Sequence, residues 1–239
     1  MKYRSLFLCL LCLAGFSRIY AHALWIEASP QGAKGTPHEI RVYFGEFTTQ
    51  DITPVEKWFS DTREFSLVVI TPSAKTITLT ATPAQDYFTA SFVPEEEGVY
   101  TVVMHHLVKE LYRGMRLHYN SSALVKVGNG PAAAPAANTN EIGITPDTPA
   151  IYKVNDQVSF RAFLRSLPAG KKEIEVIDPG GWTKKLYTNP LDETSFEPTR
   201  PGKYMLEVTN SAKASGEHNG KPVETDYWCA TYVIEVTGK

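Results

Sequence analysis

One of the six histidines of this chain directly follows a candidate cleavage site. His22 stands behind Ala21 in the stretch YAHALWIEA. A histidine that becomes the first residue of a chain can chelate one metal ion through its α-amine and its ring Nδ1, and a third nitrogen from another histidine completes a histidine brace. Such a nitrogen-rich site suits Cu(II), Ni(II) or Co(II). Cleavage after Ala23 instead would leave Leu24 first and remove this chemistry.

Four further residues are candidate ligands. His105 and His106 end the segment GVYTVVMHH, and side chains alternate between the two faces of a strand, so the two rings are expected to point in opposite directions. One of them would add the third nitrogen. His118 opens a later strand-like segment, where an aromatic residue more often packs than ligates. Glu46 follows Gly45 at the end of a strand, from which its carboxylate could enter a cleft as an oxygen ligand.

The first 21 residues have the three parts of a secretory signal peptide. Lys2 and Arg4 precede an apolar run, Leu6–Phe16, and Ala21 offers a small residue for cleavage. The apolar run is too short to anchor a chain across a bilayer, and no later run is longer. We therefore expect a periplasmic or secreted protein with no transmembrane segment in the mature chain.

Composition excludes several classes of protein. Removing the signal peptide leaves 21 basic and 26 acidic residues, a formal charge of −5, which gives no basic patch for nucleic acid. It also removes two of the three cysteines, so Cys229 has no partner for an intramolecular disulfide. The chain contains no G-x-S-x-G, H-E-x-x-H, P-loop or dinucleotide fingerprint. We expect no enzymatic activity.

The segments that must position these residues have the composition of β-strands. Segments rich in β-branched and aromatic residues are separated by Pro, Gly, Asp and Ser, and they cover residues 38–44, 65–72, 75–83, 86–94, 99–106, 156–164, 172–181, 184–188, 203–210 and 230–236. A Gly, Pro, Ala and Asn stretch without apolar pattern separates the two halves. The sequence predicts an all-β protein with two tandem Ig-like, Greek-key β-sandwich domains, arranged as a signal peptide (1–21), an N-terminal sandwich (22–128), a linker (129–140) and a C-terminal sandwich (141–239).

The two halves also match each other. FVPEEEGVY (Phe92–Tyr100) and FEPTRPGKY (Phe196–Tyr204) share the pattern F-x-P-x-x-x-G-x-Y, and HYNSSALVKV (His118–Val127) aligns without gaps to YWCATYVIEV (Tyr227–Val236). In both halves these segments predict a Pro/Gly turn between two strands, followed later by a final strand. The histidine pair has no counterpart in the second half, which carries VTN at the matching place.

Short motifs resemble one bacterial family. AHALWIE after a signal peptide, then VYFGEF, GVYTVVM, SSALVKVG and PGKYMLEV, resemble a periplasmic domain family of unknown function associated with cobalt and nickel uptake. The resemblance spans nearly the whole mature chain and implies an accessory metal-binding protein for a membrane importer. It matches His22 to the histidine that opens the mature chain. The second half resembles the carboxypeptidase-regulatory type of β-sandwich, which is often non-catalytic.

Three functions stay open on these residues. The leading one is a periplasmic or secreted protein that binds nickel or cobalt through His22 for a membrane metal importer. A structural or adhesive tandem Ig-like protein, without metal, is the first alternative. A copper monooxygenase with a histidine brace is the second, although the mature chain has neither paired cysteines nor a flat run of aromatic residues for a glycan. The ligand types do not separate nickel from cobalt or copper.

Overall fold

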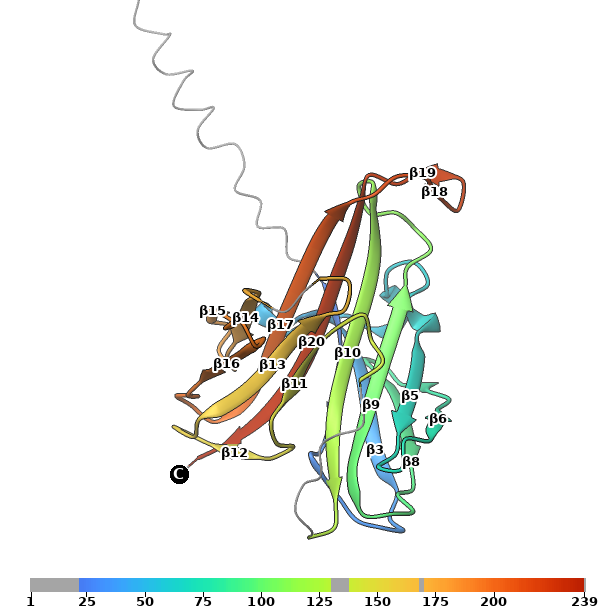
Figure 1. Cartoon of the computed structure of the whole chain (residues 1–239). Coiled ribbons are helices and arrows are strands. Elements are labelled where there is room, and N and C mark those ends of the chain that lie inside the picture. The colour runs from blue at the N-terminus through green and yellow to red at the C-terminus, as the bar shows by residue number, and fades with distance from the viewer. Residues whose placement is uncertain (1–21, 130–137, 168–169, 239) are drawn as a thin grey trace, which may run out of the picture.

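The computed structural model describes residues 22–129, 138–167 and 170–238 (Figure 1). The signal peptide and most of the predicted linker lie outside the described residues. The described chain is all-β, and each of the ten segments with strand signals contains a strand. Its helical turns are the short 3₁₀ helices η1 (Phe47–Thr49), η2 (Val55–Lys57) and η3 (Thr62–Glu64). No helix among these residues is long and apolar enough to cross a membrane.

The strands follow one another along the chain with short turns. The first half contains β1 (Ala23–Ala28), β2 (Gln31–Gly32), β3 (His38–Glu46), β4 (Asp51–Ile52), β5 (Ser66–Ile70), β6 (Thr76–Thr78), β7 (Thr82–Pro83), β8 (Phe88–Phe92), β9 (Gly98–Leu107) and β10 (Met115–Val127). The second half contains β11 (Ile142–Pro146), β12 (Tyr152–Lys153), β13 (Val158–Leu164), β14 (Glu173–Ile177), β15 (Thr183–Tyr187), β16 (Glu193–Phe196), β17 (Gly202–Lys213), β18 (Glu217–His218), β19 (Lys221–Pro222) and β20 (Thr225–Thr237).

One large sheet runs through both halves of the molecule. Its strand order is β15-β14-β17-β20-β10-β9-β5-β6, with β12 beside β20 and β2 beside β10. The halves join where β10 and β20 pair in parallel, from Met115 opposite Thr225 to Ser121 opposite Thr231. Two smaller sheets, β1-β3-β8-β7 with β4 and β11-β13-β16, pack on it. The halves are therefore joined by backbone hydrogen bonds in addition to the segment that connects them in sequence.

The two largest hydrophobic cores of the described chain lie on opposite faces of this large sheet. Paired residues of neighbouring strands point to the same face, so odd-numbered residues of β10 and β20 share one face. The first core uses that face of β10 and lies against β1, β3 and β8, with Leu24, Ile40, Val69, Tyr100 and Val125 fully or almost fully buried. The second uses the even-numbered face of β20 and lies against β11, β13 and β16, with Ile144, Phe160, Ile174, Leu206 and Ile234 buried. Figure 1 shows β13 in front of the large sheet and β3 behind it.

The repeated sequence pattern forms the same turn in both halves. The Tyr100 hydroxyl donates to the carbonyl of Glu96 at 2.9 Å and accepts its amide N–H at 3.0 Å. Tyr204 makes the same pair of bonds to Arg200, at 3.0 and 3.2 Å. Both are tyrosine corners, in which a phenol closes the connection that precedes its own strand. The shared sequence pattern of the two halves thus identifies tyrosines with the same structural role.

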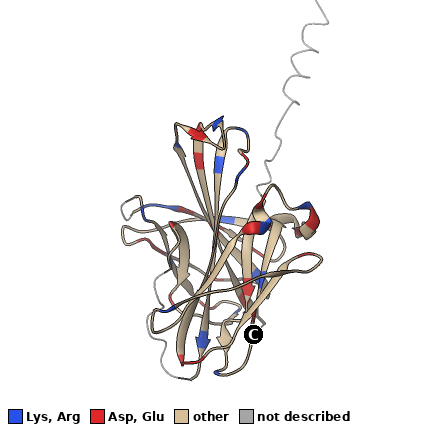
Figure 2. Cartoon of the chain, turned by 90° about the vertical axis from the view of Figure 1, so that its right-hand side faces the viewer, with Lys and Arg blue, Asp and Glu red and all other residues tan. Residues whose placement is uncertain are grey.

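Charged residues are mixed over the surface. Figure 2 shows Lys and Arg interspersed with Asp and Glu in both halves of the molecule. Several of them pair across strands, as Lys185 does with Glu173 on β15 and β14, and Arg161 with Glu193 on β13 and β16.

Candidate functional site

The start of β1 brings His22 and Glu46 together. β1 and β3 are antiparallel, and Ala23 lies opposite Gly45. Continuing this register by one pair places His22 opposite Glu46, with both side chains on the face of the first core. The ring of His22 is half-buried, with its centroid 5.3 Å from that of Phe44. No hydrogen-bond partner of the His22 ring is found among the described residues.

The Glu46 carboxylate has a structural task through one of its two oxygens. Glu46 is 8% exposed, and its Oε1 accepts the backbone N–H of Thr48 at 3.2 Å and the Thr48 hydroxyl at 2.5 Å. It therefore caps the first turn of η1, where backbone N–H groups lack partners inside the helix. The second oxygen, Oε2, has no hydrogen bond within the described part of the chain and is available to a ligand.

His105 and His106 point to opposite faces of β9, as the alternation of a strand predicts. His106 faces the first core and is 6% exposed, with its Nε2 3.2 Å from Asp61 Oδ1. His105 is exposed on the other face. The pKa of His105 is lowered, first because part of the side chain is removed from solvent and then by the neighbouring rings of His118 and His106.

His118 lies on the same outer face as His105 and has protein partners of its own. Its Nε2 is 3.1 Å from Asp226 Oδ1, and its ring stacks on Trp228 with centroids 5.1 Å apart. Arg116 holds the same carboxylate through two bonds of 2.5 and 2.8 Å. Burial lowers the pKa of His118, although Asp226 acts in the opposite direction. The His118 ring is therefore packed between a carboxylate and an indole at this strand end.

The candidate ligands thus fall into separate places. The extended register of β1 and β3 sets His22 opposite Glu46, His105 and His118 share the outer face of the large sheet, and His106 lies against Asp61. Within residues 22–129, 138–167 and 170–238, no three His, Cys, Asp or Glu side chains are grouped so that they could hold a metal ion. The His22 α-amine exists only if the bond before it is cut, so it is not among those groups.

Sequence reasoning missed a partly buried acidic group on the large sheet. Glu207 on β17 lies directly opposite Glu175 on β14. Burial raises the pKa of Glu207 to about 7, and the like charges of Glu175 and Glu46 act in the same direction. Burial and the nearby Glu207 also raise the pKa of the Cys229 thiol, which is 3% exposed. The available signal was the alternation of KYMLEV, which puts Glu207 on the same face as the apolar Met205.

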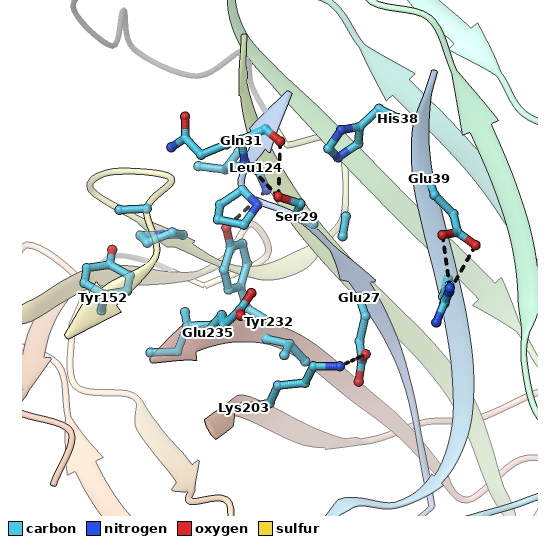
Figure 3. A pocket seen from close by; sticks show the side chains of 18 of the residues that line it. Glu27, Ser29, Gln31, His38, Glu39, Leu124, Tyr152, Lys203, Tyr232 and Glu235 are labelled. Carbon is cyan, nitrogen blue, oxygen red and sulfur yellow. Dashed lines mark hydrogen bonds and ion pairs between the residues drawn. The ribbon is translucent and has the colours of Figure 1, made fainter. Parts of the chain in front are cut away.

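A cavity of about 320 Å³ opens where the two halves meet (Figure 3). Four of the charged side chains on its wall form two ion pairs, Lys203 with Glu27 and Arg41 with Glu39. His38 also lines it and is 7% exposed, and its Nε2 has no hydrogen-bond partner among the described residues. Burial lowers the pKa of His38, which keeps the ring neutral. Glu235 lines the same wall without an ion-pair partner among the described residues, so the wall carries one acidic group more than it has basic groups.

Comparison with known proteins adds no assignment. No protein-family model and no curated protein matches this chain. The resemblance to the cobalt- and nickel-associated family stays a prediction from short motifs.

Proposed function

We propose that this chain is an exported transition-metal-binding protein that captures nickel or cobalt through His22 and passes it to a membrane importer, without catalysis. The observation that carries the proposal is the pairing of β1 with β3, because its continuation sets Glu46 opposite His22. A nitrogen ligand and an oxygen ligand then lie side by side at the first described residue of the chain.

The chemistry of this pair suits a divalent transition metal. After cleavage, the His22 α-amine and ring Nδ1 form one chelate. An α-amine has an unperturbed pKa of about 8, so part of it is unprotonated at neutral pH. The ring is already positioned by its contact with Phe44. The Oε2 atom of Glu46, which has no hydrogen bond among the described residues, would be the oxygen ligand. Imidazole and amine nitrogens favour nickel, cobalt and copper over magnesium or calcium.

Processing is the first test of the proposal. Intact mass and N-terminal sequencing of the exported protein should show a chain that begins at His22. A chain that begins at Leu24 lacks the chelate and overturns the proposal.

Metal affinity is the second test. Isothermal titration with Ni(II), Co(II) and Cu(II) compares the chain beginning at His22, the same chain with His22→Ala, and a chain that retains Ala21. The first should bind at least one metal with a Kd below about 10 μM. Both altered chains should bind at least about tenfold more weakly, because one loses the ring and the other loses the free amine.

A matched control comes from the β18–β19 hairpin. The Nε2 of His218 lies 2.8 Å from the carbonyl of Val108, so His218→Ala removes an imidazole outside the proposed site and should leave the affinity unchanged. Failure of the unaltered chain to bind any of the three metals more tightly than about 10 μM refutes the metal-binding function.

A further inference from the structure

A row of paired residues crosses four strands of the large sheet. From β10 through β20 and β17 to β14, the row consists of Ser121, Thr231, Glu207 and Glu175. Side chains of directly paired residues project from the same face of a sheet. All four therefore project toward β1, which passes over this face.

β1 crosses the strands of this row. Every second residue of β1 lies over the next strand of the row. The Ile26 N–H donates to the serine Oγ of the row at 3.0 Å, and the Leu24 carbonyl accepts from the threonine Oγ1 at 2.8 Å. Two residues of β1 span about 6.8 Å. Neighbouring strands of the large sheet lie about 4.8 Å apart, so two residues of β1 are long enough to reach from one strand of the row to the next. The next step of the same progression places His22 over Glu207, the third member of the row.

The backbone of His22 faces the large sheet as well. Backbone groups of alternate residues point to opposite edges of a strand, and those of Leu24 and Ile26 point away from β3. Phe44, the residue opposite Leu24, likewise turns its carbonyl outward to the amide of Thr53, at 2.9 Å. His22 has the same parity as Leu24, so its nitrogen is directed toward Glu207.

We propose that Glu207 supplies a carboxylate ligand to the divalent transition-metal ion that the amine and ring of His22 chelate. This inference rests on the proposed function and adds a residue from the second half of the chain to its site. The metal would then be held between β1 and β17, and Glu46 would lie on the other side of His22.

The surroundings of Glu207 favour a bound cation. Directly opposed like charges destabilise a pair of strands, and Glu207 faces Glu175 without an ion-pair partner among the described residues. Lys185 lies opposite Glu175 on β15 but pairs with Glu173 instead, so neither Glu175 nor Glu207 has an ion-pair partner in the described part of the chain.

The test uses the full mature chain beginning at His22, with Glu207→Gln and the control Glu235→Gln. Glu235 is an exposed carboxylate on β20 of the same sheet. Titration with Ni(II) at pH 7.5 should give a Kd at least about tenfold higher for Glu207→Gln and an unchanged Kd for the control. Visible absorption of the Co(II) complex should change for Glu207→Gln alone, because one ligand oxygen is replaced.

Two results overturn the inference in distinguishable ways. If the unaltered chain binds metal and Glu207→Gln binds equally well with the same Co(II) spectrum, Glu207 is not a ligand and the function through His22 stands. If the unaltered chain binds none of the metals, the function and the inference fail together. Glu207→Asp keeps the charge and shortens the reach, so it should bind with an intermediate Kd, and the urea unfolding midpoint of each variant checks that it is folded.

Discussion

Replacing Thr231 by valine should loosen β1 from the large sheet. Thr231 is 1% exposed, and its Oγ1 donates to the carbonyl of the fully buried Leu24 at 2.8 Å. Valine has nearly the same shape as threonine, so the change removes the hydroxyl without opening a cavity. A buried carbonyl left without a partner costs about 1–3 kcal/mol. We expect the free energy of unfolding to fall by that amount.

Urea unfolding followed by tryptophan fluorescence measures this change. With a slope of about 2 kcal/mol per molar urea, the midpoint should fall by about 0.5–1.5 M. Thr209→Val is the matched control, because Thr209 is an exposed threonine of β17, and its effect should stay within about 0.5 kcal/mol. Equal midpoints for the two variants would refute the view that the hydroxyl of Thr231 holds β1 in place.

Two further predictions concern Asp226 and Cys229. Arg116 lowers the pKa of Asp226 below its ordinary 3.8, so the stability that this carboxylate contributes is fully present above that value and is lost as the pH falls through the folded-state pKa. Asp226→Asn should therefore be less stable than the unaltered chain at pH 7, by about 1–3 kcal/mol, and the gap between their urea midpoints should shrink below pH 4; a gap that stays constant down to pH 2 contradicts the assignment. Cys229 should not react with a thiol reagent such as DTNB at pH 8 in native buffer, because burial covers its sulfur and raises its pKa, whereas in urea it should react fully. Labelling of the native chain within seconds would show that the face beneath β1 is open.

The strands and the repeated turns could be predicted from local patterns. Alternating β-branched and aromatic residues mark strands because one face of each is buried. The shared pattern around Tyr100 and Tyr204 identified equivalent positions, because a phenol that closes its own turn needs a fixed spacing. These features depend on residues close together in sequence, and a single chain displays them.

The joining of the halves could not be predicted in the same way. Parallel pairing of β10 with β20 unites segments about a hundred residues apart, and nothing in either segment specifies the other as its neighbour. The same limit applies to the site. The alternation of KYMLEV puts Glu207 on the face of the apolar Met205, but nothing in that segment specifies that β1 packs on this face.

The parallel pairing of β10 and β20 also covers a strand edge that would otherwise be open. β10 is 13 residues long, and in the intact molecule each of its two edges is paired along part of its length, with β9 on one side and β20 on the other. A fragment that ended at residue 128 would expose the edge that β20 covers, with its unpaired N–H and C=O groups. Such an edge is a template for pairing with another copy, and in the intact molecule β20 covers it.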